Sequence, residues 1–161
     1  MTSHVVLAWE DFDLWIADLV KTVRFSQQSR KSPLKFVYGP PRGGVIPAVA
    51  LSHRLGIPWV GSFRELSDAL WKTEGTFADV LWVDEIVESG KTLETFLDQC
   101  LSHPLRGGDP LKTCWVSKLP STRFPALHSG ITVEKDTWVV FPWEDPITWK
   151  RELEEYNARR Q

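Results

Sequence analysis

The chain has 161 residues, 42% of them hydrophobic, and a net charge of −2 at pH 7. This length is most simply one domain, residues 1–161, that is large enough to bury a core. The near-neutral charge does not indicate a strongly basic surface, although it leaves room for a local basic pocket, so we do not expect nucleic acid as a partner. The sequence has no apolar run of membrane-spanning length and no signal-peptide pattern, so we expect no membrane association.

Cysteine and histidine do not form a recognisable site in this sequence. Cys100 and Cys114 are too few and too isolated for a disulfide framework or a zinc site, which indicates a reducing, cytoplasmic location. The four histidines are scattered without the spacing of metal ligands. We therefore expect the histidines to be surface or packing residues.

Helical and strand patterns alternate along the chain, which predicts an α/β fold with a mainly parallel sheet flanked by helices. In the first half of the chain we expect a helix over 9–23, a connection over 26–32, a strand over 34–38 and a helix over 45–55 ended by Gly56. A strand over 59–63, an ambiguous polar stretch over 64–76, a strand over 80–83 and a helix over 93–101 should follow. The last elements are strands over 113–117 and 137–141 and a helix over 146–159 opened by Asp145 and Pro146.

The most informative segment is residues 80–92. Four apolar residues lead into two adjacent acids, Asp84 and Glu85, at the end of a predicted buried strand. In open α/β sheets ligands bind just outside the carboxyl ends of the strands, so the acids should lie at the ligand edge. The turn at Ser89 then opens a helix, whose N-terminus favours anions through its free N–H groups and its dipole. The segment predicts a phosphate site beside two acids.

Two other interpretations of this segment are weaker. A Walker A motif would explain Gly90, Lys91 and Thr92, but it needs glycine at the position of Glu85. An ordinary strand end followed by a helix cap would explain Ser89 and Gly90, but it leaves the paired acids unexplained.

A second anion site is indicated by Arg42, Gly43 and Gly44, which follow the strand predicted over 34–38. Glycines let backbone N–H groups approach a ligand, and the arginine guanidinium donates in a geometry that suits phosphate. Taken alone, this tripeptide is equally explained as a turn with an exposed arginine. Lys118 follows the strand over 113–117, where its ammonium can donate to a carbonyl oxygen of a base, although an ordinary surface lysine is the alternative.

Together these segments resemble the type I phosphoribosyltransferases. Residues 80–92 are similar to their ribose-phosphate signature, Arg42-Gly43-Gly44 to their pyrophosphate loop, and residues 135–144 to the C-terminal hood of xanthine-guanine and other 6-oxopurine enzymes. The resemblance implies the type I phosphoribosyltransferase fold, with a small C-terminal hood over about 131–145. It also implies transfer of the phosphoribosyl group of phosphoribosyl pyrophosphate (PRPP) to guanine, xanthine or hypoxanthine, giving a nucleoside monophosphate and pyrophosphate, by a homo-oligomer (a dimer or tetramer).

The resemblance also implies roles for individual residues. Asp84 and Glu85 would hold the ribose hydroxyls and a Mg²⁺ cofactor, and Glu88 would be the general base. The other expected contacts are Ser89, Gly90, Lys91 and Thr92 with the 5′-phosphate, Arg42, Gly43 and Gly44 with pyrophosphate, and Lys118, Trp138 and Val139 with the purine. Stacking of Trp138 on the base has core packing as its alternative. A cis peptide is expected between Pro41 and Arg42.

The chain departs from the family pattern at several points. Pro41 replaces a serine, Glu85 replaces the second aspartate, and Glu88 stands where 6-oxopurine enzymes usually have aspartate. Residues 64–79 are shorter than the mobile flap that normally closes over the site. These departures motivate an alternative function, a non-catalytic regulator or sensor with the same fold that binds PRPP or a nucleotide.

Overall fold

The computed structural model describes residues 3–105, 107–120, 123–124 and 126–159. Its strands are β1 (His4–Val6), β2 (Phe36–Tyr38), β3 (Trp59–Val60), β4 (Val80–Val87), β5 (Leu111–Ser117), β6 (Leu127–Thr132) and β7 (Trp138–Val140). Its helices are α1 (Trp9–Ser29), α2 (Val45–Leu55), α3 (Phe63–Lys72), α4 (Lys91–Ser102) and α5 (Pro146–Ala158), with a 3₁₀ helix, η1, over Phe77–Asp79.

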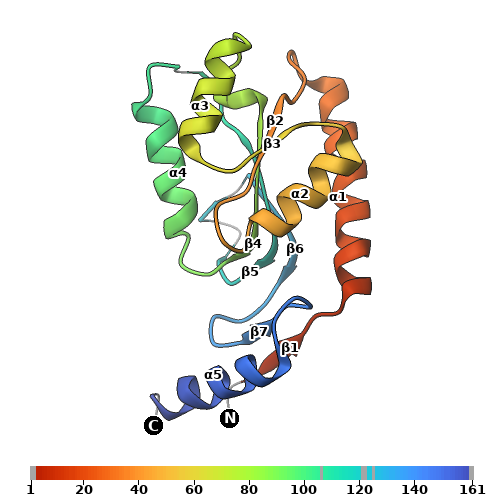
Figure 1. The fold of residues 1–161 in the computed structure, drawn as a ribbon, viewed down its shortest axis with the longest axis vertical. Coiled ribbons are helices and arrows are strands. Elements are labelled where there is room, and N and C mark those ends of the chain that lie inside the picture. Colours follow the sequence, from red (N-terminus) through yellow and green to blue (C-terminus); the bar gives the residue numbers. More distant parts are fainter. Residues whose placement is uncertain (1–2, 106, 121–122, 125, 160–161) are drawn as a thin grey trace.

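Five strands form a parallel sheet in the order β3-β2-β4-β5-β6, and β1 pairs in parallel with β7 in a second, smaller sheet. Figure 1 shows α1 and α2 on one side of the main sheet and α3 and α4 on the other. The small sheet and α5 lie together beyond the end of β6 at which the chain leaves the main sheet (Figure 1). The predicted α/β fold with a parallel sheet is therefore confirmed.

The core has one layer on each side of the main sheet, because successive residues of a strand face opposite sides. Leu81 and Val83 of β4 pack with the buried side chains of α1 and α2. Val80 and Trp82 pack with those of α3 and α4. The apolar run at the start of β4 is thus covered on both faces, as expected for a central parallel strand.

The first helix is longer than the sequence pattern indicated. A connection was expected over 26–32, but α1 continues to Ser29. The hydroxyls of Ser26 and Ser29 donate to the carbonyl oxygens of Val23 and Ser26, at 2.8 and 3.1 Å. Because this last part of the helix is mostly solvent-exposed, it lacks the apolar periodicity on which the prediction depended.

The expected strand over 59–63 was wrong beyond its first two residues. Ser62 is the N-cap of α3, and its hydroxyl accepts the backbone N–H of Glu65 at 3.2 Å. The Glu65 carboxylate accepts the N–H of Gly61 in turn, at 3.1 Å. These two bonds satisfy donors at the start of the helix, so the chain leaves the strand conformation early. The ambiguous stretch 64–76 is consequently mostly helix.

The other helix boundaries moved less, whereas three strands, β4, β6 and β1, differ from the prediction. The central strand β4 runs through the two acids to Val87, whereas the prediction ended it at residue 83. The edge strand β6 and the short strand β1 had no clear sequence pattern, because most of their residues are exposed. Among the described residues, no helix is long and apolar enough to cross a membrane.

Aromatic rings join the small sheet to the main one. Trp115 of β5 stacks on Trp15 of α1, with ring centroids 5.6 Å apart, and meets Phe12 edge-on at 5.4 Å. Trp143, which follows β7, stacks on Phe141 at 5.1 Å and also meets Phe12 edge-on. This aromatic cluster (Phe12, Trp15, Trp115, Phe141 and Trp143) fixes the hood segment against α1 and β5.

We expect Trp115→Ala to lower the free energy of unfolding by about 3–5 kcal/mol, because it would leave a cavity in this cluster. Trp115 is 2% exposed, whereas Trp71 on α3 is 69% exposed. The matched control Trp71→Ala should change stability by no more than about 0.5 kcal/mol. Urea unfolding of both variants measures the difference, and equal losses would contradict the central position of Trp115.

Candidate active site

The two acids of β4 lie past the carboxyl end of the neighbouring strand. Tyr38, the last residue of β2, pairs with Trp82, so Asp84 and Glu85 extend beyond β2 while β4 still pairs with β5. Because side chains alternate along a strand, Asp84 continues the face of Trp82 and Glu85 the opposite face. The acids were expected after the strand; they lie within it, at the predicted edge of the sheet.

The loop between β2 and α2 packs directly against one of these acids. A β-carbon at Gly43 would lie 1.9 Å from Oε1 of Glu85, so a larger residue here would force the Glu85 carboxylate to move. The Pro41–Arg42 peptide bond is cis, as predicted. Gly44 turns inward, where its N–H donates to the carbonyl of Pro40 at 3.0 Å. The loop thus brings Arg42 and Gly43, from a distant part of the sequence, to the acids.

The segment after β4 presents backbone donors at the start of α4. Gly90 is the N-cap, has a φ of +79° and makes no side-chain capping bond. The left-handed conformation favours glycine here, and the first N–H groups of a helix have no partners within the helix. The Ser89 hydroxyl accepts the N–H of Lys91 at 3.4 Å. This turn, residues 89–92, has the geometry and the dipole of an anion site.

A cavity of about 280 Å³ joins these parts. It brings together most of the residues that the sequence singled out, although Gly44, Lys118, Trp138 and Val139 do not line it. The lining residues are Pro41, Arg42, Gly43, Asp84, Glu85, Ile86, Val87, Glu88, Ser89, Gly90, Lys91, Thr92 and Leu93.

Burial sets the electrostatics of the acids. Asp84 is 8% exposed, and this burial raises its pKa to about 7. The backbone N–H of Glu85, which donates to the Asp84 carboxylate at 2.8 Å, lowers the pKa, and the charge of Glu85 adds a smaller rise. Burial and the charge of Glu144 raise the pKa of Glu85 to about 7, whereas the Trp143 side chain and the Arg42 charge lower it. Oε2 of Glu85 is buried without a hydrogen-bond partner among the described residues. A cation or hydroxyl groups placed here would satisfy these oxygens.

Lys118 lies next to this cavity. Its backbone N–H donates to the carbonyl of Val87 at 2.9 Å, which extends the pairing of β5 with β4. Its ammonium forms an ion pair with the carboxylate of Glu88. The lysine side chain is 9% exposed and the glutamate 60%. Lys118, expected to contact the purine, and Glu88, expected to accept its proton, are therefore adjacent.

The other expected purine contacts lie in the hood. Trp138 packs against Tyr156 of α5, with ring centroids 5.3 Å apart, and its indole N–H is buried without a hydrogen-bond partner among the described residues. Val139 is buried in the core. In the free protein both side chains thus pack against other residues. For Trp138, packing of this kind was the alternative to stacking on the base.

Sequence reasoning did not assign a role to Trp143 or Glu144, although both belong to the hood motif. Glu144 folds back, and its carboxylate accepts the N–H of Phe141 at 2.8 Å. Both side chains influence the pKa of Glu85, as described above. The sequence signal for these two residues was their position directly after Pro142 in the hood motif. That position does not indicate that they lie near Glu85 of β4.

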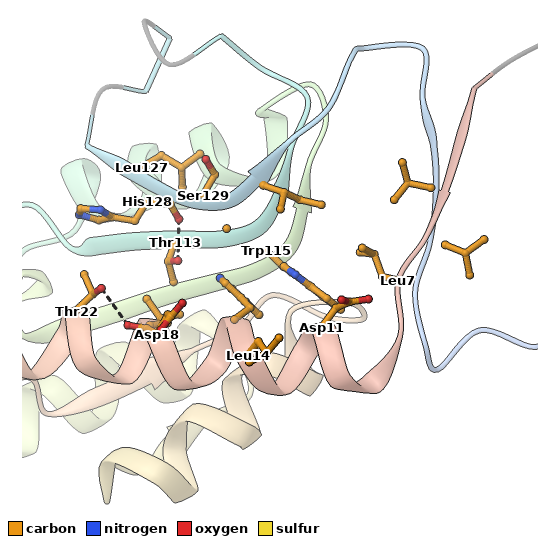
Figure 2. A pocket seen from close by; sticks show the side chains of 16 residues that line it. Leu7, Asp11, Leu14, Asp18, Thr22, Thr113, Trp115, Leu127, His128 and Ser129 are labelled. Atoms are coloured by element: carbon orange, nitrogen blue, oxygen red, sulfur yellow. Dashed lines mark hydrogen bonds between the residues drawn. The ribbon is translucent and has the colours of Figure 1, made fainter.

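A larger cavity, of about 840 Å³, lies between α1 and β6 and contains none of the expected site residues (Figure 2). Its acids are engaged locally: Asp11 accepts the N–H of Ala8, and Asp18 pairs with Lys21. Thr113 donates to the carbonyl of His128 (Figure 2). Without a convergent set of reactive groups, this cavity is a poorer candidate than the edge of the sheet.

Known proteins resemble this chain in both sequence and fold. No protein-family profile matched the chain. A xanthine-guanine phosphoribosyltransferase of Cereibacter sphaeroides is 30% identical over 138 residues, which cover 76% of this chain and 75% of that protein. The chain belongs to the xanthine-guanine phosphoribosyltransferase family. The enzyme of that name from Vibrio parahaemolyticus is 23% identical over 92% of this chain and 94% of its own.

Solved structures agree with this family. The purine phosphoribosyltransferase of Pyrococcus horikoshii has a TM-score of 0.65 and 28% identity, covering 88% of this chain and 94% of its own. The xanthine-guanine-hypoxanthine phosphoribosyltransferase of Helicobacter pylori has a TM-score of 0.61 at 21% identity, covering 92% and 99%, and shows the same fold. The type I phosphoribosyltransferase fold expected from the sequence is confirmed.

We expect Asp84→Asn to stabilise this phosphoribosyltransferase at pH 8 by about 4 kcal/mol. Since burial raises the pKa of Asp84 from 3.8 to about 7, the folded protein holds a proton that the unfolded chain releases between these pH values. The wild type therefore loses stability as the pH rises from about 4 to 7, and the variant does not.

Urea unfolding at pH 4, 6 and 8 measures this difference. The advantage of Asp84→Asn should be absent at pH 4 and largest at pH 8. Glu154→Gln, an exposed position on α5, should show no such trend. A stability difference that does not change with pH would mean that ionised Asp84 carries no cost in the free protein.

Proposed function

We propose that the protein transfers the 5-phosphoribosyl group of PRPP to guanine, xanthine or hypoxanthine and releases pyrophosphate. The chain is an enzyme of the phosphoribosyltransferase family. The observation that carries the proposal is one cavity lined by the Arg42 loop, the acids of β4 and the anion site at residues 89–92. These parts match the pyrophosphate, ribose and 5′-phosphate of PRPP. The comparisons do not favour the non-catalytic sensor, because the named relatives are enzymes.

The acids fit a Mg²⁺ ion that is shared with the substrate. Asp84 and Glu85 supply carboxylate oxygens, the hard ligands that this ion prefers, and one of these oxygens is buried without a partner. Among the described residues, no cluster of three or more His, Cys, Asp or Glu side chains could hold a metal by itself. Substrate oxygens would therefore complete the coordination. When bound, Mg²⁺ would neutralise charge on the departing pyrophosphate.

The chain's own residues would act mainly by positioning and electrostatics. Arg42 and the backbone N–H of Gly43 would hold the pyrophosphate, and residues 89–92 the 5′-phosphate. Positive charge spreads over the ribose as its bond to pyrophosphate breaks, and the carboxylates of Asp84 and Glu85 would stabilise it. Their burial makes this interaction stronger than it would be in water.

Recognition of the purine would involve Lys118 and the hood. The Lys118 ammonium would donate to the 6-oxo group, and Glu88, its ion-pair partner, would accept the proton released from the base as the new bond to ribose forms. Trp138 would stack on the base after turning from Tyr156, and the backbone at Val139 would contact its edge. A homo-oligomer, dimeric or tetrameric, and a cytoplasmic location remain predictions.

A product assay tests the proposal directly. The protein is incubated with PRPP, Mg²⁺ and guanine, xanthine, hypoxanthine or adenine, and nucleoside monophosphates are separated by chromatography. We expect product from at least one 6-oxopurine and none from the double variant Asp84→Asn, Glu85→Gln. Binding of PRPP without product from any base would instead favour the sensor.

Glu88→Gln tests the general base. We expect kcat to fall by about 10²-fold or more, the usual loss when a general base is removed, with little change in PRPP affinity. Steady-state kinetics and calorimetry measure the two quantities, with Glu154→Gln on α5 as the control. A kcat equal to that of the wild type would remove Glu88 from the mechanism.

A further inference from the structure

Lys118, directly after β5, contacts the two residues that precede the phosphate segment 89–92. Lys118 bonds to Val87 through its backbone and to Glu88 through its ammonium. The Ser117 hydroxyl accepts the N–H of Leu119 at 3.2 Å, which fixes the start of the segment that follows β5. Lys118, the residue expected to contact the base, therefore lies directly beside the strand end that leads into residues 89–92.

The segment that follows β5 also covers Gly90. A β-carbon at Gly90 would lie 2.6 Å from Cε2 and 3.1 Å from Cζ of Phe124, and 3.1 Å from Cδ1 of Leu119. Both side chains belong to the hydrophobic layer beneath α4, where each is partly buried. The Phe124 ring thus rests on the glycine whose left-handed backbone opens the anion site.

Arg123 holds this ring from the outer side. Its guanidinium bonds to the carboxylate of Glu94, in the first turn of α4, at 2.7 Å. It also lies over the Phe124 ring, 5.7 Å from the ring centre. An ion pair and a cation–π contact therefore tie Phe124 to the helix whose N-terminus would bind the phosphate.

We propose that Phe124 is a positioning residue for the 5′-phosphate of the substrate, acting through Gly90. The inference rests on the proposed function, because it takes residues 89–92 as the phosphate site. Backbone N–H groups recognise phosphate only when the turn that carries them is held in one conformation. Gly90 has no side chain to restrict its turn, and the packed ring supplies that restriction.

The position of Phe124 makes its effect selective. The pyrophosphate loop, at Arg42 and Gly43, is built on β2 and packs on Glu85. It makes none of the contacts that hold Gly90. Loss of the ring should therefore weaken ligands that carry a 5′-phosphate and leave pyrophosphate binding unchanged.

Calorimetric titration of Phe124→Ala with guanosine monophosphate and with pyrophosphate, each with Mg²⁺, tests the inference. We expect Kd for the monophosphate to rise about tenfold and Kd for pyrophosphate to stay at the wild-type value. In the enzyme assay, KM for PRPP should rise while kcat changes little. The control Phe25→Ala, an exposed ring on α1, should change neither Kd.

Phe124→Leu keeps an apolar group against Gly90 and should raise Kd for the monophosphate by only about threefold. This variant decides the question if Phe124→Ala does not fold. Unchanged monophosphate affinity in the folded variants, or equal weakening of both ligands, would overturn the inference. A wild-type protein that forms no product and binds neither ligand would instead overturn the proposed function.

Discussion

The site depends on the contact between the Glu85 carboxylate and Gly43. Glycine lets the loop after β2 pack closely on the central strand, because a β-carbon at residue 43 would displace the Glu85 carboxylate. Burial of the two acids at this edge of the sheet raises the pKa of both Asp84 and Glu85. The free protein therefore holds two acids in an environment that disfavours their charge, and a ligand that brings cations or hydroxyl groups would relieve this cost.

Short-range patterns in the sequence predicted the strand and the helix start that form this edge of the sheet. Four apolar residues before Asp84 predicted a buried central strand, and the turn at Ser89 predicted a helix N-terminus at the same edge. Arg42 and Asp84 come together because β2 and β4 are neighbouring parallel strands, which share one carboxyl edge. Each of these inferences needed only local periodicity and a general rule about sheets.

Contacts between distant segments could not be predicted in this way. Nothing in the sequence around Trp143 or Phe124 indicates that these side chains pack near Glu85 and Gly90, because each contact depends on where the hood and the β5–β6 connection settle. The helix α3 was missed for a different reason. Its start is fixed by hydrogen bonds of Ser62 and Glu65, whereas Trp59, Val60 and Phe63 favoured a strand.

A crystal structure with guanosine monophosphate, pyrophosphate and Mg²⁺ would test the central claim most directly. We expect the 5′-phosphate on the backbone N–H groups of residues 89–92, the ribose hydroxyls at Asp84 and Glu85, and pyrophosphate on the Arg42 loop. A nucleotide bound elsewhere, for example in the cavity between α1 and β6, would contradict the assignment of this edge of the sheet as the active site.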